Sequence, residues 1–196
     1  MVAVAQKTKT LAEYLESQPD DGAVYELENG EWLEMPPECD LNRRIASFLY
    51  IYLAQIGIPY YLLSQKTEVA VASAKVSLRV PDLMVLSEEA ALALENTKRS
   101  TITQDMPPPD LVIEVVSPGQ TNINRDYRYK RAQYQAQGIP EYWIVDPISG
   151  KVTILVMNEG LYDESVFEGS DVISSPLLQR YPSDQKLTVA QILQKK

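Results

Sequence analysis

Apolar and polar residues follow two different periods along this chain, and together they predict a mixture of strands and helices. Helical spacing of apolar residues runs from Asp40 to Gly57 and again from about Asn122 to Gln137. Asn29-Gly30 separates two strand-like runs and predicts a hairpin. Other short apolar runs predict strands at residues 60–63, 67–72, 78–86, 111–116, 142–145, 152–157 and 162–167.

The order of these elements predicts a fold class. Leu111–Val116 is β-branched and almost wholly apolar, which is typical of a strand buried on both faces. A helix and then the strand 142–145 follow it, so we expect a parallel crossover. We therefore expect an α/β (α+β) fold with a central mixed β-sheet flanked by helices. A length of 196 residues fits one domain over residues 1–196, with 1–9 as a flexible N-terminus.

Composition removes several kinds of chemistry. The chain has no histidine and a single cysteine, Cys39, which excludes imidazole bases, histidine-bound zinc and dithiol chemistry. The net charge of −9 and the pI near 4.6 argue against loose, non-specific association with nucleic acid. We find no signal peptide and no apolar run of the ~20 residues that a membrane span needs. We expect a cytoplasmic protein with no membrane partner.

Two acidic residues lie inside strand-like apolar runs. Asp82 follows Pro81 among Val80, Leu83 and Met84, and Glu114 lies in the middle of Leu111–Val116. A carboxylate in apolar surroundings is costly unless it binds a cation or accepts hydrogen bonds. The simpler interpretation is that each is a strand-end acid that reaches solvent, but two such residues favour a joint role in binding a cation.

Lys130 is the third candidate. Ile123, Tyr127, Lys130 and Tyr134 form one helical stripe that we expect to face inward, while Arg125, Arg128 and Arg131 occupy other faces. An inward ammonium beside a carboxylate-bearing strand is suited to neutralising phosphate charge. The alternative is that Lys130 reaches solvent or pairs with Asp126 four residues before it.

Several motifs resemble a bacterial family of restriction endonucleases of unknown function within the PD-(D/E)XK nuclease superfamily. The resemblance runs from about Leu11 to the C-terminus and is most specific from Pro107 to Asp146. It rests on the following motifs: Tyr25-Glu26-Leu27, Pro81-Asp82, residues 108–118 (PPDLVIEVVSP), the spacing Asp126…Lys130…Tyr134, and residues 138–146 (GIPEYWIVD).

This resemblance implies a restriction-endonuclease-like core in which Asp82 and Glu114 are the two acids of the site. The usual lysine of the superfamily would fall at Val116, and Lys130 matches the position to which the family moves it. Many members also have a histidine where this chain has Asn42. Glu26 matches an acid that the family often keeps near the site.

We therefore expect a Mg²⁺-dependent endonuclease, with Mn²⁺ able to substitute and DNA as the substrate. Asp82, Glu114 and the backbone carbonyl of Val115 would hold the metal, Lys130 would stabilise charge on the phosphate, and Glu26 would lie in the outer shell. The alternative is a catalytically inactive scaffold that binds nucleic acid or protein, as Val116, Asn42 and the acidic pI suggest. We also expect a homodimer, because the hairpin leaves a sheet edge to be covered.

Overall fold

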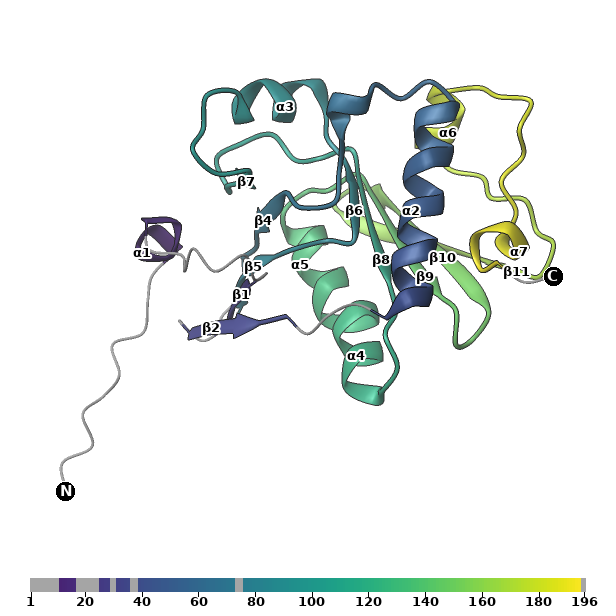
Figure 1. The fold of residues 1–196 in the computed structure, drawn as a ribbon, viewed down its shortest axis with the longest axis horizontal. Coiled ribbons are helices and arrows are strands. Elements are labelled where there is room, and N and C mark those ends of the chain that lie inside the picture. The colour runs from purple at the N-terminus through teal and green to yellow at the C-terminus, as the bar shows by residue number, and fades with distance from the viewer. Residues whose placement is uncertain (1–10, 17–24, 29–30, 36–38, 73–75, 195–196) are drawn as a thin grey trace.

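The computed structural model describes residues 11–16, 25–28, 31–35, 39–72 and 76–194, and in this part the chain forms two mixed sheets with helices around them (Figure 1). The expected flexible segment 1–9 and the turn residues Asn29 and Gly30 lie outside the described ranges. The expected mixed α+β architecture with flanking helices is confirmed, whereas the division into two sheets was not predicted.

The six-stranded sheet has the order β11-β10-β9-β8-β6-β3. β8 and β9 pair in parallel, as the predicted crossover requires, and the other neighbours are antiparallel. Every residue of β8 and of β9 is buried, which agrees with their apolar sequences. The strands are β3 (Leu63–Ser64), β6 (Leu83–Val85), β8 (Leu111–Val115), β9 (Glu141–Asp146), β10 (Lys151–Asn158) and β11 (Leu161–Glu168).

The five-stranded sheet has the order β2-β1-β5-β4-β7. β1 and β2 form the expected antiparallel hairpin, with Glu28 opposite Glu31, and β2 lies at one edge of the sheet. The strands are β1 (Tyr25–Glu28), β2 (Glu31–Glu34), β4 (Glu68–Ala70), β5 (Val76–Arg79) and β7 (Thr101–Ile102).

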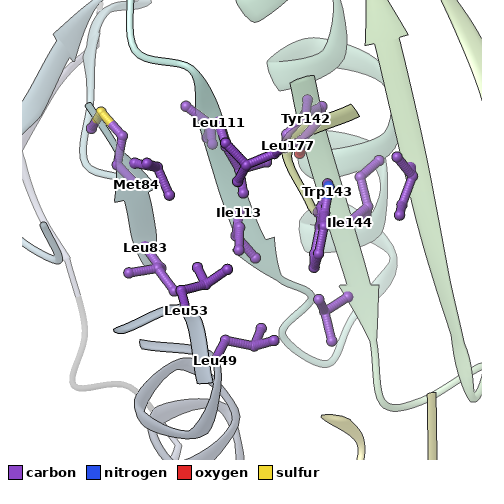
Figure 2. Close-up of a cluster of buried hydrophobic side chains, with 14 of the residues drawn as sticks. Leu49, Leu53, Leu83, Met84, Leu111, Ile113, Tyr142, Trp143, Ile144 and Leu177 are labelled. Carbon is purple, nitrogen blue, oxygen red and sulfur yellow. The ribbon is translucent and has the colours of Figure 1, made fainter. Parts of the chain in front are cut away.

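Most helices flank the six-stranded sheet, whereas Leu11 of the first helix packs against Leu27 and Leu78 of the five-stranded sheet. α2 packs Leu49 and Leu53 into the same core as Leu83 of β6, Ile113 of β8 and Trp143 of β9 (Figure 2). The helical elements are α1 (Leu11–Glu16), α2 (Asp40–Gln55), η1 (Tyr60–Leu62), α3 (Glu88–Leu94), α4 (Gln120–Asn124), η2 (Arg125–Lys130), α5 (Arg131–Ala136), α6 (Pro176–Arg180) and α7 (Val189–Ile192).

The helix expected at 122–137 is present, but its middle is not α-helical. α4, η2 and α5 follow one another without interruption from Gln120 to Ala136, and η2 is a π-helical turn. π-turns inside α-helices are rare and occur frequently at functional sites. This helical segment lies beside β1 and β5 (Figure 1), where Arg79 of β5 donates to Gln133 of α5.

Two predicted strands are wrong in detail. The run 78–86 is not one strand, because Arg79 ends β5 in one sheet and Leu83 begins β6 in the other. Pro81 lies at the break, where its missing N–H and fixed φ interrupt strand pairing. The run 60–63 is mostly the short helix η1, and only its last residue, Leu63, enters β3.

Candidate active site

Asp82 lies at the point where the chain leaves one sheet for the other. Its side chain is half-buried, and its Oδ2 accepts a hydrogen bond of 2.6 Å from the backbone N–H of Val115. Val115 directly follows Glu114 on β8, so this bond fixes the Asp82 carboxylate beside the second acid. The break at Pro81 therefore places Asp82 between the two sheets rather than inside the strand pairing of one sheet.

Glu114 is 2% exposed, and both of its carboxylate oxygens have partners. Oε1 accepts the hydroxyl hydrogen of Tyr134 at 2.6 Å, and Oε2 lies 2.7 Å from Nζ of Lys130. Tyr134 and Lys130 are four residues apart on the helical segment that crosses from β8 to β9. The crossover thus carries both groups that hold the Glu114 side chain.

Lys130 is buried and lies between two carboxylates. Besides its contact with Glu114, its Nζ is 3.2 Å from Oδ1 of Asp126. The structure therefore brings Asp82, Glu114 and Lys130 together as expected, and it also contains the pairing with Asp126 that we had considered as the alternative. Their roles in catalysis remain a prediction.

The pKa values follow from burial and from these charges. Burial, together with the nearby carboxylates of Asp82 and Asp126, raises the pKa of Glu114 to about 7 against the opposing effect of Lys130. Burial disfavours the charged form of Lys130, but Glu114 and Asp126 outweigh it and raise the lysine pKa above its ordinary value. Lys130 is consequently a cation at neutral pH, while Glu114 changes charge close to neutrality.

A cleft of about 710 Å³ opens over these residues. Asp82, Glu114, Val115 and Lys130 all contribute to its lining, and so do the cationic side chains of Arg43 and Arg125. Other residues that line it include Glu34, Gln65, Ser117 and Asn122. The candidate site is therefore open to a ligand and contains both carboxylates and cations.

Asn42 and Val116, the two residues that depart from the family pattern, both lie next to Val115 in the structure. Asn42 of α2 is buried and donates from Nδ2 to the carbonyl of Val115 and to Oγ of Ser117, both at 3.2 Å. Its amide thus lies directly against the carbonyl expected to bind metal. Val116 is fully buried, and its N–H bonds to the carbonyl of Val145 at 2.8 Å, so this strand position faces the core.

Glu26 lies behind the cleft, as expected of an outer-shell acid: after Glu114 and Asp126, it is a further carboxylate near enough to raise the pKa of Lys130. It lies on β1, is 1% exposed, and does not belong to the residues that line the cleft. Its Oε2 is 2.6 Å from Nη1 of Arg79, whose Nε donates to Gln133 at 2.9 Å. The acid is therefore part of a buried connection between the five-stranded sheet and α5.

Sequence reasoning missed the full part played by Asp126 and Tyr134. Asp126 is 1% exposed and lies 3.2 Å from Lys130, so it is a buried part of the site, whereas its spacing alone predicts only an ordinary partner one turn away. Tyr134 lies in the core as its place in the inward stripe predicts, but the pattern does not reveal its hydrogen bond to Glu114. The regular spacing of Asp126, Lys130 and Tyr134, each four residues from the next, is the signal that places all three on one face.

The donor atoms of the site are oxygens. Within the residues that the structure describes, no group of three or more acidic or cysteine side chains is arranged to hold a metal ion. A cation in the cleft would therefore rely on the two carboxylates of Asp82 and Glu114, the Val115 carbonyl, and water. Mg²⁺ is commonly bound through one or two carboxylates and retains several waters, so these residues fit it.

Comparison with known proteins agrees with this architecture. No curated protein matches the chain. A crystal structure described as a putative nuclease belonging to DUF820 from Anabaena variabilis ATCC 29413 is similar, with a TM-score of 0.65 and 16% sequence identity over 94% of this chain and 97% of that chain. At this identity, the similarity concerns the fold. Among the helices that the structure describes, none is long and apolar enough to cross a membrane.

The family itself is identified from the sequence. Residues 11–190 match the family described as "Putative restriction endonuclease" (Uma2), and this range includes Asp82, Glu114 and the whole helical crossover. Because the match covers nearly the entire chain, the protein belongs to the putative restriction endonuclease family.

Proposed function

We propose that the protein is a metal-dependent nuclease that hydrolyses phosphodiester bonds of DNA. The observation that carries this proposal is the convergence of Asp82, Glu114 and Lys130 on one cleft, although they come from a sheet-to-sheet connection, a central strand and a helix. Membership of the restriction endonuclease family supports nuclease activity. The two acids and the displaced lysine also support a place in the PD-(D/E)XK superfamily.

Mg²⁺ is the ion that suits this site, and Mn²⁺ is expected to substitute for it. Asp82, Glu114 and the Val115 carbonyl would hold it. The hydrogen bonds that Glu114 accepts leave its oxygens with further lone pairs, so they do not prevent ligation. When bound, such an ion makes water nucleophilic near neutral pH and withdraws charge from a phosphate.

The side chains of the protein supply the remaining functions. Lys130 is protonated at neutral pH, so it does not serve as a general base; it stabilises the negative charge that develops on the phosphate. Tyr134 orients Glu114 through its hydroxyl, and the backbone N–H of Val115 orients Asp82. These fixed contacts place the acids and the ammonium before the substrate arrives.

An anionic substrate is compatible with this site despite the acidic composition of the chain. Lys130, Arg125 and Arg43 line the same cleft as the two acids, so positive charge is present where the phosphate would lie. Arg43 also pairs with Asp40 at 2.7 Å on the surface. A local concentration of cations can outweigh the net charge because interactions beyond about 10 Å are screened at ordinary ionic strength.

The experiment is a cleavage assay with double-stranded DNA in Mg²⁺ and in Mn²⁺. We expect wild-type cleavage to require the ion, and Asp82→Ala and Glu114→Ala to abolish it, because each removes a ligand charge. Glu164→Gln is the matched control, since Glu164 is an exposed acid that pairs with Arg131 on the surface. Absence of cleavage by the wild type across metals and pH would favour the inactive scaffold instead.

A further inference from the structure

The π-turn places the side chain of Arg125 on the same side of the helix as that of Lys130. In an α-helix, residues five apart are displaced by about 140° around the axis, so Arg125 and Lys130 would point in different directions. A π-turn closes its hydrogen bonds between residues five apart and brings them close to the same face. Arg125 and Lys130 are the first and last residues of η2, and both line the cleft.

The other two arginines of this helix have different positions. Arg131 pairs with Glu164 of β11, its Nη1 lying 2.6 Å from Oε2. Arg128 is exposed and does not belong to the residues that line the cleft. Arg125 therefore differs from both, although the sequence gives all three the same charge on the same helix.

Asp126 holds Arg125 and Lys130 together. Its Oδ1 lies 3.5 Å from Nε of Arg125 and 3.2 Å from Nζ of Lys130. Its own backbone is fixed, because its carbonyl accepts the hydroxyl hydrogen of Tyr142 at 3.1 Å. Its Oδ2 is buried and has no hydrogen-bond partner among the described residues. The carboxylate thus directs both cations toward the cleft wall.

The charges around the cleft favour one kind of ligand for this pair. Asp82, Glu114 and Asp126 provide three carboxylates, and Lys130 and Arg125 provide two cations, which leaves one negative charge. The opposite charges of Glu34 and Arg43, which also line the cleft, offset each other. A bound divalent ion would change this net charge to one positive, and the single negative charge of a phosphodiester would then bring it to zero. The planar guanidinium of an arginine is also suited to binding two oxygens of one phosphate.

We propose that Arg125, held by Asp126, binds a backbone phosphate of the nucleic acid beside Lys130. This inference rests on the proposed nuclease function. Only Nε of Arg125 has a protein partner among the described residues. The side chain is 27% exposed, so part of it remains accessible to a ligand.

The experiment measures binding of a fluorescently labelled DNA duplex by anisotropy in Ca²⁺ at several salt concentrations, with DNA integrity checked on gels. Arg125→Gln should weaken binding about tenfold, the value of a charged hydrogen-bonded contact. It should also lower the slope of log affinity against log salt by about 0.9, as expected for one lost phosphate contact. Arg125→Lys should keep the slope but bind less tightly.

Two further variants separate this role from a general effect of charge. Arg128→Gln removes the same charge from the same π-turn outside the cleft, and it should bind DNA as the wild type does. Asp126→Asn adds net positive charge to the site, so simple electrostatics predicts tighter DNA binding. We expect weaker binding, because Arg125 loses the group that orients it. Melting temperatures of all variants establish that they are folded.

The outcomes distinguish this inference from the proposed function. If Arg125→Gln and Arg128→Gln weaken binding equally, or if Asp126→Asn binds DNA more tightly, the assignment of Arg125 is overturned even though the wild type cleaves DNA. If the wild type neither binds nor cleaves DNA, both the proposed function and this inference fail.

Discussion

The ammonium of Lys130 lies 2.7 Å from Oε2 of Glu114, although one residue comes from a helical crossover and the other from a central strand. This contact gives the site an amine that its strand does not carry, since Val116 faces the core at the position where the amine would otherwise be. The ammonium is also shared with Asp126. The cation of the site thus depends on the packing of η2 against β8.

Replacing Lys130 should reduce stability and turnover but should not prevent metal binding. Lys130→Met leaves the buried carboxylates of Glu114 and Asp126 without their shared cation, a loss that costs about 3–5 kcal/mol in buried ion pairs. Chemical denaturation at pH 8 measures this change. Arg131→Met is the control and should cost no more than about 1 kcal/mol, because its partner Glu164 is exposed at the surface and solvent screens the pair.

Bound metal should restore part of the stability that the protein loses in Lys130→Met. A divalent ion bound at Glu114 neutralises one of the carboxylates that Lys130→Met leaves without a partner, so Mn²⁺ should raise the melting temperature of this variant more than that of the wild type. An equal or smaller shift in the variant would contradict a shared site for the ion and the ammonium.

Metal affinity should depend on pH near neutrality. In the folded protein the pKa of Glu114 is raised to about 7, so the carboxyl takes up a proton as the pH falls below that value. Mn²⁺ requires the ionised form, and its affinity should therefore be about tenfold lower at pH 6 than at pH 8 and level off above pH 8. Calorimetric titrations at pH 6, 7 and 8 measure it. An affinity that is constant over this range would contradict a Glu114 ligand that titrates near pH 7.

Glu26 should affect stability rather than metal binding. Arg79→Met removes the cation from a pair whose side chains are 4% and 2% exposed, and it leaves Glu26 as a buried charge with Oε1 already lacking a partner among the described residues. We expect a loss of about 3–5 kcal/mol. The Mn²⁺ affinity should stay within about twofold of the wild type. A large change in affinity would show that Glu26 takes a direct part in metal binding.

The edge of the five-stranded sheet should be covered by a second copy of the chain. β2 is the outermost strand beside β1, and an open strand edge exposes hydrogen-bonding groups that proteins usually protect. We expect light scattering at micromolar concentration to give twice the 22.1 kDa of one chain. A mass of one chain would reject the homodimer.

Much of this architecture is readable from periodicity. The apolar run of β8 and the helical stripe of α2 depend on local patterns, and both elements lie where the sequence predicts them. The inward direction of Lys130 also follows from its spacing with Tyr134. These features are predictable because side-chain period and burial are directly coupled within one element.

Other features depend on contacts between distant segments. Pro81 marks a possible break in the run 78–86, but only the pairing of its two halves with different sheets makes Asp82 a junction residue. The π-turn is likewise hidden, because the sequence of Arg125–Lys130 has the composition of an ordinary helix. The α-helical period therefore gave the wrong face for Arg125, and the hairpin position of Glu26 did not reveal its pairing with Arg79.

The central claim is that Asp82 and Glu114 bind a divalent cation, and calorimetric titration of the metal-free protein with Mn²⁺ at pH 8 tests it most directly. We predict saturable binding by the wild type, its loss in Asp82→Ala and Glu114→Ala, and its retention in the surface control Glu164→Gln. Binding that persists unchanged in both alanine variants, or no binding by the folded wild type, would contradict the account.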